Sequence, residues 1–147
     1  MIKQNVLPIL FCVLLISGCA SPQRTSEIAV AQLIKSTVSW NGDTLPATNI
    51  VHPEITILNI TIPPHHSLPM HTHPVINAGV LLKGQLTVTT QRGQVLHLKA
   101  NEPIVEVVDT WHYGKNDGNE PAQIIVFYIG QPNQPITIKK TGNKTGH

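Results

Sequence analysis

The chain is poor in cysteine, in charge and in aromatic residues, and each shortage excludes a class of protein. Only two of the 147 residues are cysteine, Cys12 and Cys19, so the sequence beyond residue 19 offers no disulfide framework, thiolate nucleophile or sulfur metal ligand. Charged residues make up 12% of the chain and the formal net charge is +2, with no basic cluster of the kind that binds nucleic acid. Aromatic residues contribute 4%, whereas Pro (12) and Gly (10) are frequent, which favours one domain of short strands and turns over a helical bundle.

Residues 1–18 have the pattern of an export signal. Lys3 precedes an apolar run from Val6 to Ile16, which is shorter than the about 20 residues needed to span a bilayer. The run leads into Leu15-Ile16-Ser17-Gly18-Cys19, which resembles the lipobox of bacterial lipoproteins. The resemblance implies a lipoprotein signal peptide, lipidation of Cys19 and attachment to a membrane, with an ordinary signal peptide as the alternative. For a Gram-negative source, Ala20 after the cysteine implies an outer-membrane protein that faces the periplasm.

The remaining sequence divides into a tether with an N-terminal strand (residues 19–50), a β-rich domain (51–138) and a flexible tail (139–147). In the tether, Glu27–Lys35 is at most a short helix, and Thr37–Trp40 is the expected strand. The strands expected in the domain are Ile55–Ile62, Val75–Leu82, Gln85–Thr90, Gln94–Lys99, Ile104–Val108 and Gln123–Ile129. Short strands at this spacing, separated by turn signals, predict an all-β sandwich or barrel.

Histidine is the residue in excess, and its distribution suggests a metal site. Four of the eight histidines fall within nine positions: His65, His66, His71 and His73. Two side chains at positions i and i+2 of a strand point to the same face, about 6–7 Å apart, so the pair at 71 and 73 can converge on one ion. The pair at 65 and 66 follows two prolines in an expected loop, and we expect it to be solvated.

The residues after His73 extend the pattern. Asn77 follows after three residues and Gly84 after six more; later, His112 is followed after three residues by Asn116. This arrangement resembles the two sequence motifs of the cupin family, over about Ile55 to Ile129. The resemblance implies an all-β cupin barrel, that is, a double-stranded β-helix or jelly roll.

The resemblance also implies one divalent metal ion held by His71, His73 and His112. The family glutamate of the first motif falls on Asn77, so the usual fourth ligand is replaced by an amide. Glu106 is the candidate that restores the charge, as a fourth ligand or as a catalytic base. It lies an even number of residues before His112, which favours an interior position, and a solvent-facing position on an edge strand is the alternative.

Two other motif positions also differ from the family. Its second-motif Pro and Gly fall on Val107 and Asp109, and its Gly-Asp pair falls on Asn101-Glu102. Both departures alter turns, so they bear on the metal shell more than on the fold.

Imidazole and carboxylate donors without thiolate favour Fe or Mn, with Zn or Ni as alternatives. The first functional hypothesis is a metal-dependent enzyme acting on a small polar or anionic organic molecule by dioxygenase, isomerase or lyase chemistry, as the resemblance implies. The second is a non-catalytic metal- or small-ligand-binding protein of the cell envelope, because fold alone does not distinguish the two. By analogy with the family, the strand Ile55–Ile62 is a candidate edge for a homodimer.

Overall fold

The computed structural model describes residues 28–141, so the expected export signal and Cys19 lie outside the described residues. The strands are β1 (Glu54–Ile62), β2 (His71–Thr72), β3 (Ile76–Lys83), β4 (Gln85–Thr90), β5 (Val95–Lys99), β6 (Pro103–Val105), β7 (His112–Lys115), β8 (Ala122–Gly130) and β9 (Ile138–Lys139). No described segment forms a helix long and apolar enough to cross a membrane. The all-β prediction is confirmed, and residues 28–35 of the tether are not helical.

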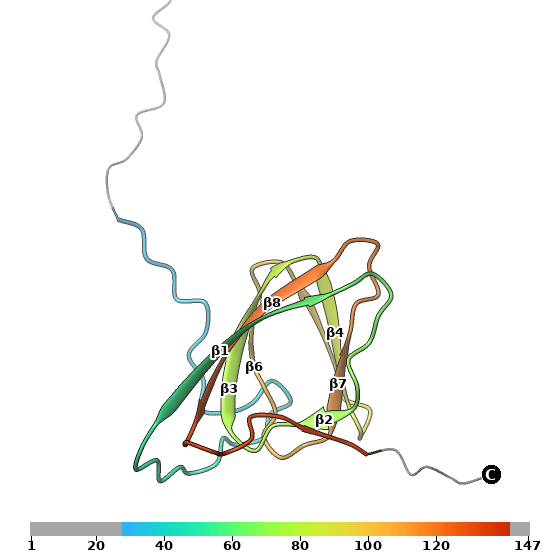
Figure 1. Cartoon of the computed structure of the whole chain (residues 1–147). Helices are drawn as coiled ribbons and strands as arrows, with labels where there is room; N and C mark the ends of the chain where they lie inside the picture. The colour runs from blue at the N-terminus through green and yellow to red at the C-terminus, as the bar shows by residue number, and fades with distance from the viewer. Residues whose placement is uncertain (1–27, 142–147) are drawn as a thin grey trace, which may run out of the picture. The chain divides into compact units, whose positions relative to one another are not determined.

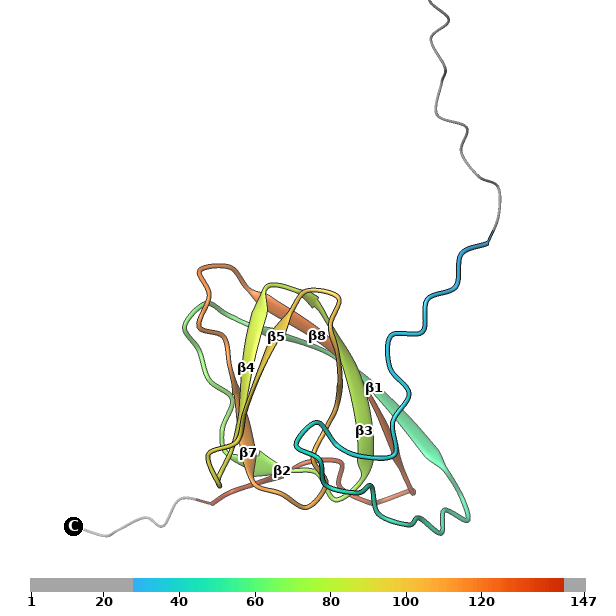
Figure 2. The ribbon, with the colours of Figure 1, turned by 180° about the vertical axis from the view of Figure 1, so that it is seen from behind.

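The strands form two antiparallel sheets. One has the order β1-β8-β3-β6 and the other the order β5-β4-β7-β2-β9. Figures 1 and 2 show the sheets facing each other, with β1, β3 and β8 on one side and β4 and β7 on the other. Most neighbouring strands are distant in the sequence, the hairpin β4-β5 excepted, and β1 pairs with β8 along its whole length from Glu54↔Gly130 to Ile62↔Ala122. The double-stranded arrangement therefore depends on long-range pairing.

Alternating side chains build the interior. Along β8 the inward-facing residues are buried and their neighbours are more exposed, the period of two that a half-buried strand requires. The apolar core between the sheets consists of Ile62, Val75, Leu81, Leu86, Val88, Leu98, Ile104, Ala122, Ile124, Val126 and Tyr128. Burial of these side chains supplies the main stabilisation of the fold, at about 25 cal/mol per Å² of apolar surface.

Gly84 turns the chain between β3 and β4, at the position that the motif assigns to glycine. Its φ of +77° lies in the left-handed region, and a Cβ there would lie 2.8 Å from the carbonyl oxygen of Pro121. Only glycine meets both conditions without a shift of the backbone.

Two expected strands are wrong in extent. Thr37–Trp40 contributes only an isolated bridge, Val38↔Thr44, because the chain turns at once through Gly42, whose φ is +93°. The strand expected over Ile104–Val108 ends at Val105 as β6. It stops early because the chain leaves β3 after Glu106 and turns at Asp109, whose φ is +51° and whose N–H donates to the carbonyl of His73.

Candidate metal centre

The second sheet brings together the three histidines singled out by their spacing. His71 opens β2 and is the direct antiparallel partner of His112, the first residue of β7. His73 lies just beyond β2, since that strand ends at Thr72. The ring centroids are separated by 4.4 Å (71 to 112), 4.9 Å (71 to 73) and 5.1 Å (73 to 112). One ligand atom from each ring lies within 4.8 Å of the other two, and this is the only such group of His, Cys, Asp or Glu in residues 28–141.

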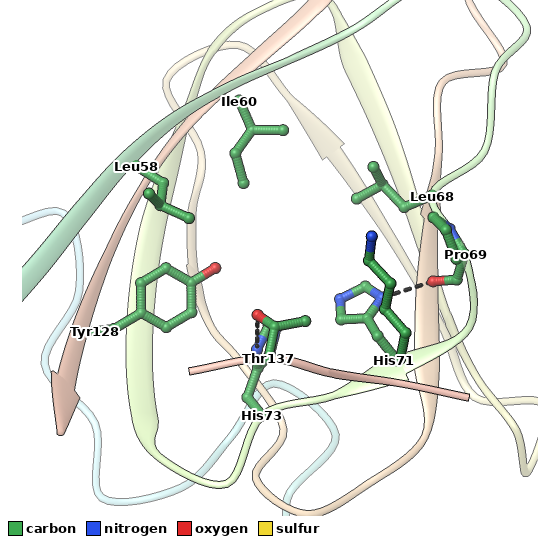
Figure 3. Close-up of a pocket in the computed structure, with 9 residues that line it drawn as sticks. Leu58, Ile60, Leu68, Pro69, His71, His73, Tyr128 and Thr137 are labelled. Carbon is green, nitrogen blue, oxygen red and sulfur yellow. Dashed lines mark hydrogen bonds between the residues drawn. The ribbon is translucent and has the colours of Figure 1, made fainter. Parts of the chain in front are cut away.

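Backbone carbonyls hold all three rings in the same way. Nδ1 of His71 donates to the Pro69 carbonyl (2.7 Å; Figure 3), and Nδ1 of His112 donates to the Thr110 carbonyl (2.8 Å). Nδ1 of His73 donates to the carbonyl of Ile136 at 2.8 Å. A carbonyl can only accept, so each Nδ1 carries the proton and each neutral ring keeps its lone pair on Nε2. Metal-binding histidines are oriented by this kind of hydrogen bond.

Burial keeps the rings neutral. Desolvation lowers the pKa of His73 to about 4 and that of His112 to about 4, in spite of the hydrogen bonds to the backbone that favour the charged form. The pKa of His71 is lowered as well, chiefly by desolvation and further by the nearby charge of Lys139. At neutral pH the site therefore presents three unprotonated nitrogens, the form that binds a metal ion.

Glu106 lies in the interior, the first of the two positions considered for it. Its side chain is buried, and its Oε2 lies 3.7 Å from Nε2 of His112. Neither of these two buried atoms has a hydrogen-bond partner. Burial raises the pKa of Glu106 to about 7, so the carboxyl exchanges a proton near neutral pH. Buried polar atoms without partners are costly, and a metal ion would satisfy both of them.

Asn77 and Glu106 are neighbours on adjacent segments. The N–H of Glu106 donates to the carbonyl of Asn77 at 3.1 Å, and both side chains are buried. The Asn77 amide donates to the carbonyl of Val75, while its Oδ1 has no partner. The carboxylate that the cupin pattern places at position 77 is thus found one strand away, at position 106.

Two cavities meet at the histidines. The inner one has a volume of about 40 Å³ and is lined by all three rings together with Glu106 and Tyr128. That volume suits an ion with one or two waters, since a single water needs about 10–15 Å³ on this measure. The outer one has a volume of about 150 Å³ and lies over His71 and His73 (Figure 3). Figure 3 shows the hydroxyl of Tyr128 pointing into this outer cavity, and desolvation raises its pKa to about 12, so it stays protonated.

Sequence reasoning missed two residues of the outer cavity, Thr137 and Lys139. Lys139 was assigned to the tail, but it pairs with His71 as part of β9. No local pattern signals a pairing between positions 68 residues apart, so the cavity wall was not predictable from the sequence.

The other histidines among residues 28–141 lie outside the centre. His65 and His66 are exposed, as expected for their loop, and His97 is an exposed residue of β5. Asn116 closes a turn: its amide donates to the carbonyls of Ile62 and Glu120, and its Oδ1 accepts from the N–H of Gly118.

Comparison with known proteins supports the same fold. The model of the Cupin domain family matches residues 58–128. No match is found among curated proteins. One solved structure with a similar fold is an uncharacterized conserved protein with a double-stranded β-helix domain from Klebsiella pneumoniae (TM-score 0.50, 19% identity, 65% of this chain and 90% of that chain).

Two further similar structures are of proteins with named activities. One is an oxalate decarboxylase formate complex from Lactobacillus farciminis (TM-score 0.50, 20% identity, 58% of this chain and 26% of that chain). The other is a polyketide cyclase from Streptomyces resistomycificus (TM-score 0.51, 14% identity, 61% of this chain and 63% of that chain). The chain spans less than two thirds of either protein, and identities this low show the fold alone.

Proposed function

We propose that this chain is a cupin that holds one divalent metal ion at His71, His73 and His112 and uses it to act on a small organic molecule. The observation that carries the proposal is the identical anchoring of the three rings, with each Nδ1 donating to a backbone carbonyl and each Nε2 left free. The match of residues 58–128 to the Cupin domain is independent support.

The donor set fits a first-row metal ion. Three neutral imidazoles and one adjacent carboxyl suit Fe or Mn best, with Zn or Ni as alternatives, and no thiol lies among the described residues to select a softer ion. Once bound, the ion would supply Lewis acidity at its open positions.

The chain's own groups have separate roles. Glu106, with its pKa of about 7, holds or releases a proton at Oε2 beside the ligand nitrogen of His112. Tyr128, whose protonated hydroxyl points into the outer cavity, can donate a hydrogen bond to a molecule bound there. Apolar side chains, among them Leu58, Ile60 and Leu68, line the same cavity.

Reaction type is the open choice, because decarboxylases and cyclases share this fold. The test is to load the full chain with Fe(II), Mn(II) or Zn(II) and to follow oxygen uptake and product formation with a panel of catechols, thiols and keto acids. We expect metal-dependent turnover with at least one compound, and a loss of about 10²–10⁴-fold in kcat for Glu106→Gln with the metal still bound. If the protein binds a compound tightly but converts none with any of the three metals, the enzyme hypothesis is contradicted. The hypothesis of a non-catalytic binding protein is then favoured.

We place the protein in the cell envelope, exported and anchored by a lipid on Cys19. The support is the sequence Leu15–Cys19 with its preceding apolar run. Mass spectrometry of the N-terminal peptide should show a diacylglyceryl cysteine at position 19, and Cys19→Ser should release the protein from membranes. An unmodified Cys19 would contradict this location.

A homodimer is the expected assembly. The outer face of the first sheet carries exposed apolar side chains in register, with Ile55 opposite Ile129 and Ile57 opposite Phe127. Large exposed apolar patches commonly mark interfaces. Sedimentation should give a dimer that Phe127→Asp converts to a monomer; a monomeric native protein would contradict the proposal.

A further inference from the structure

The outer cavity is lined by one lysine, Lys139. Its lining consists of Leu58, Ile60, Leu68, Pro69, His71, His73, Tyr128, Thr137 and Lys139. No acidic residue lines the cavity. Lys139 forms no ion pair with any residue in the part of the chain that the structure describes. A cation with no acidic partner therefore lines this cavity.

The backbone fixes where Lys139 lies. Lys139 pairs with His71, and Ile138 with Thr72, so β9 forms the edge strand beside the metal centre. The next residue, Lys140, donates its N–H to the carbonyl of Met70 and its ammonium to Oε1 of Gln91 at 3.0 Å. The two adjacent lysines thus differ in role: Lys139 lines the cavity, and Lys140 is already occupied outside it.

The other walls set the size and polarity of a ligand. Leu58, Ile60, Leu68 and Pro69 are apolar and surround the space above His71 (Figure 3). The volume of about 150 Å³ equals that of cavities in protein interiors that take up benzene. A long chain or a sugar-sized polar molecule does not match both the volume and the apolar walls.

We propose that the outer cavity binds a small monocarboxylate with a compact apolar body the size of a benzene ring, and that Lys139 is the residue that selects its negative charge. This inference rests on the proposed function, since it names the substrate class of the same centre. The apolar body fills the space between Leu58, Ile60 and Leu68, and the ammonium of Lys139 donates charge-assisted hydrogen bonds to the carboxylate.

Benzoate is the probe, and benzyl alcohol is its neutral counterpart of similar size. Binding to the purified full chain is measured by calorimetry, without metal and with Zn(II), and metal content is measured on the same samples. Three proteins are compared: the native chain, Lys139→Met, and Lys140→Met as the matched control. Lys139→Met keeps an unbranched apolar side chain of similar length and removes the ammonium group.

We expect the native chain to bind benzoate about tenfold more tightly than it binds benzyl alcohol. Lys139→Met should lose about fivefold to tenfold of benzoate affinity, a modest factor because Lys139 is exposed to solvent, and it should keep its affinity for benzyl alcohol. Lys140→Met should bind both probes as the native chain does, and all three proteins should take up equal zinc.

Three results would overturn the inference: equal affinity for the two probes, unchanged benzoate affinity in Lys139→Met, or no binding of benzoate to native protein that has taken up zinc. In each case, zinc uptake by the native protein would still support the proposed metal centre. The converse result, Lys139-dependent benzoate binding by a chain that takes up no zinc, would contradict the metal centre and keep the anion-selective cavity.

Discussion

The two ends of the interior between the sheets are built from different chemistry, and β8 shows the change along one strand. Its inward side chains run from Ala122 and Ile124, in the apolar core, to Tyr128, beside His73. At the first end the inward side chains of β8 are apolar, and the buried amide of Asn116 is fully hydrogen-bonded. In residues 28–141, five buried side-chain atoms lack a hydrogen-bond partner, and four of them belong to residues at or beside the histidine end: Thr72, Asn77, Glu106 and His112.

The contrast teaches which end supplies stability and which supplies function. Apolar burial stabilises the fold, whereas buried polar atoms without partners reduce stability by about 1–3 kcal/mol each. A protein keeps such groups where a ligand completes them. We therefore expect substitutions at the two ends to separate stability from metal binding.

The largest effect is expected from Leu81→Ala at the apolar end. Leu81 is fully buried in the core, so the substitution leaves a cavity and should lower the free energy of unfolding by about 2–5 kcal/mol. Metal content per folded chain should not change. Leu82→Ala, at the exposed neighbouring position, is the control and should cost little. Urea denaturation measures the free energy of unfolding, and elemental analysis of the same samples measures the metal content. Loss of metal from folded Leu81→Ala would contradict the separation of stability from metal binding.

The next effect concerns the pH dependence of metal affinity. In the metal-free protein the pKa of Glu106 is about 7, so below pH 7 the carboxyl binds a proton that a nearby metal ion would displace. Affinity should therefore fall as pH falls from 7, by at most about tenfold per pH unit. In Glu106→Gln the affinity should fall less steeply, and only as protons compete for the three histidine rings, whose pKa values burial has lowered.

Zinc titrations at several pH values between 5 and 7.5 measure the two slopes. If zinc affinity depends on pH with the same slope in the native chain and in Glu106→Gln, Glu106 does not interact with the metal. The metal centre would then consist of the three histidines alone.

The last comparison concerns the corners of the two ends. Gly84 at one end and Asp109 at the other both have positive φ. Gly84→Ala should cost more than about 2 kcal/mol, because a Cβ would press on the Pro121 carbonyl oxygen as well as adopt a strained φ. Asp109→Gly should change stability by less than about 1 kcal/mol, since relief of the backbone is offset by the freer unfolded chain. Thermal unfolding of the two variants gives the order, and a larger effect at Asp109 would contradict it.

The sequence predicted the fold and the three rings well, for a physical reason. Alternation of apolar residues is local, and it located β4 without error and β1, β3, β5 and β8 to within a residue at either end. The histidines were identified by their spacing in the motif. The turn at Asp109, which follows the early end of β6, also has a cause in the sequence. Asp109 occupies the turn position that the cupin pattern gives to Gly, and it adopts the left-handed φ that glycine would adopt.

The rest of the site depends on contacts across the fold. The neighbouring positions of Asn77 and Glu106 come from the pairing of β3 with β6, and the placement of Lys139 comes from the pairing of β9 with β2. Neither pairing leaves a periodic signal in either segment. The position of Glu106 could be argued only by counting residues to His112, and that of Lys139 could not be argued at all.

The most direct test of the metal centre is the metal content of protein purified without chelators and dialysed against metal-free buffer. The native chain and His97→Ala, which removes an exposed histidine of β5, should each retain about one equivalent of a divalent ion per chain. His112→Ala removes the ring that joins β7 to the pair beside β2, and it should retain less than about a tenth of that amount. Equal metal in all three proteins would contradict the account.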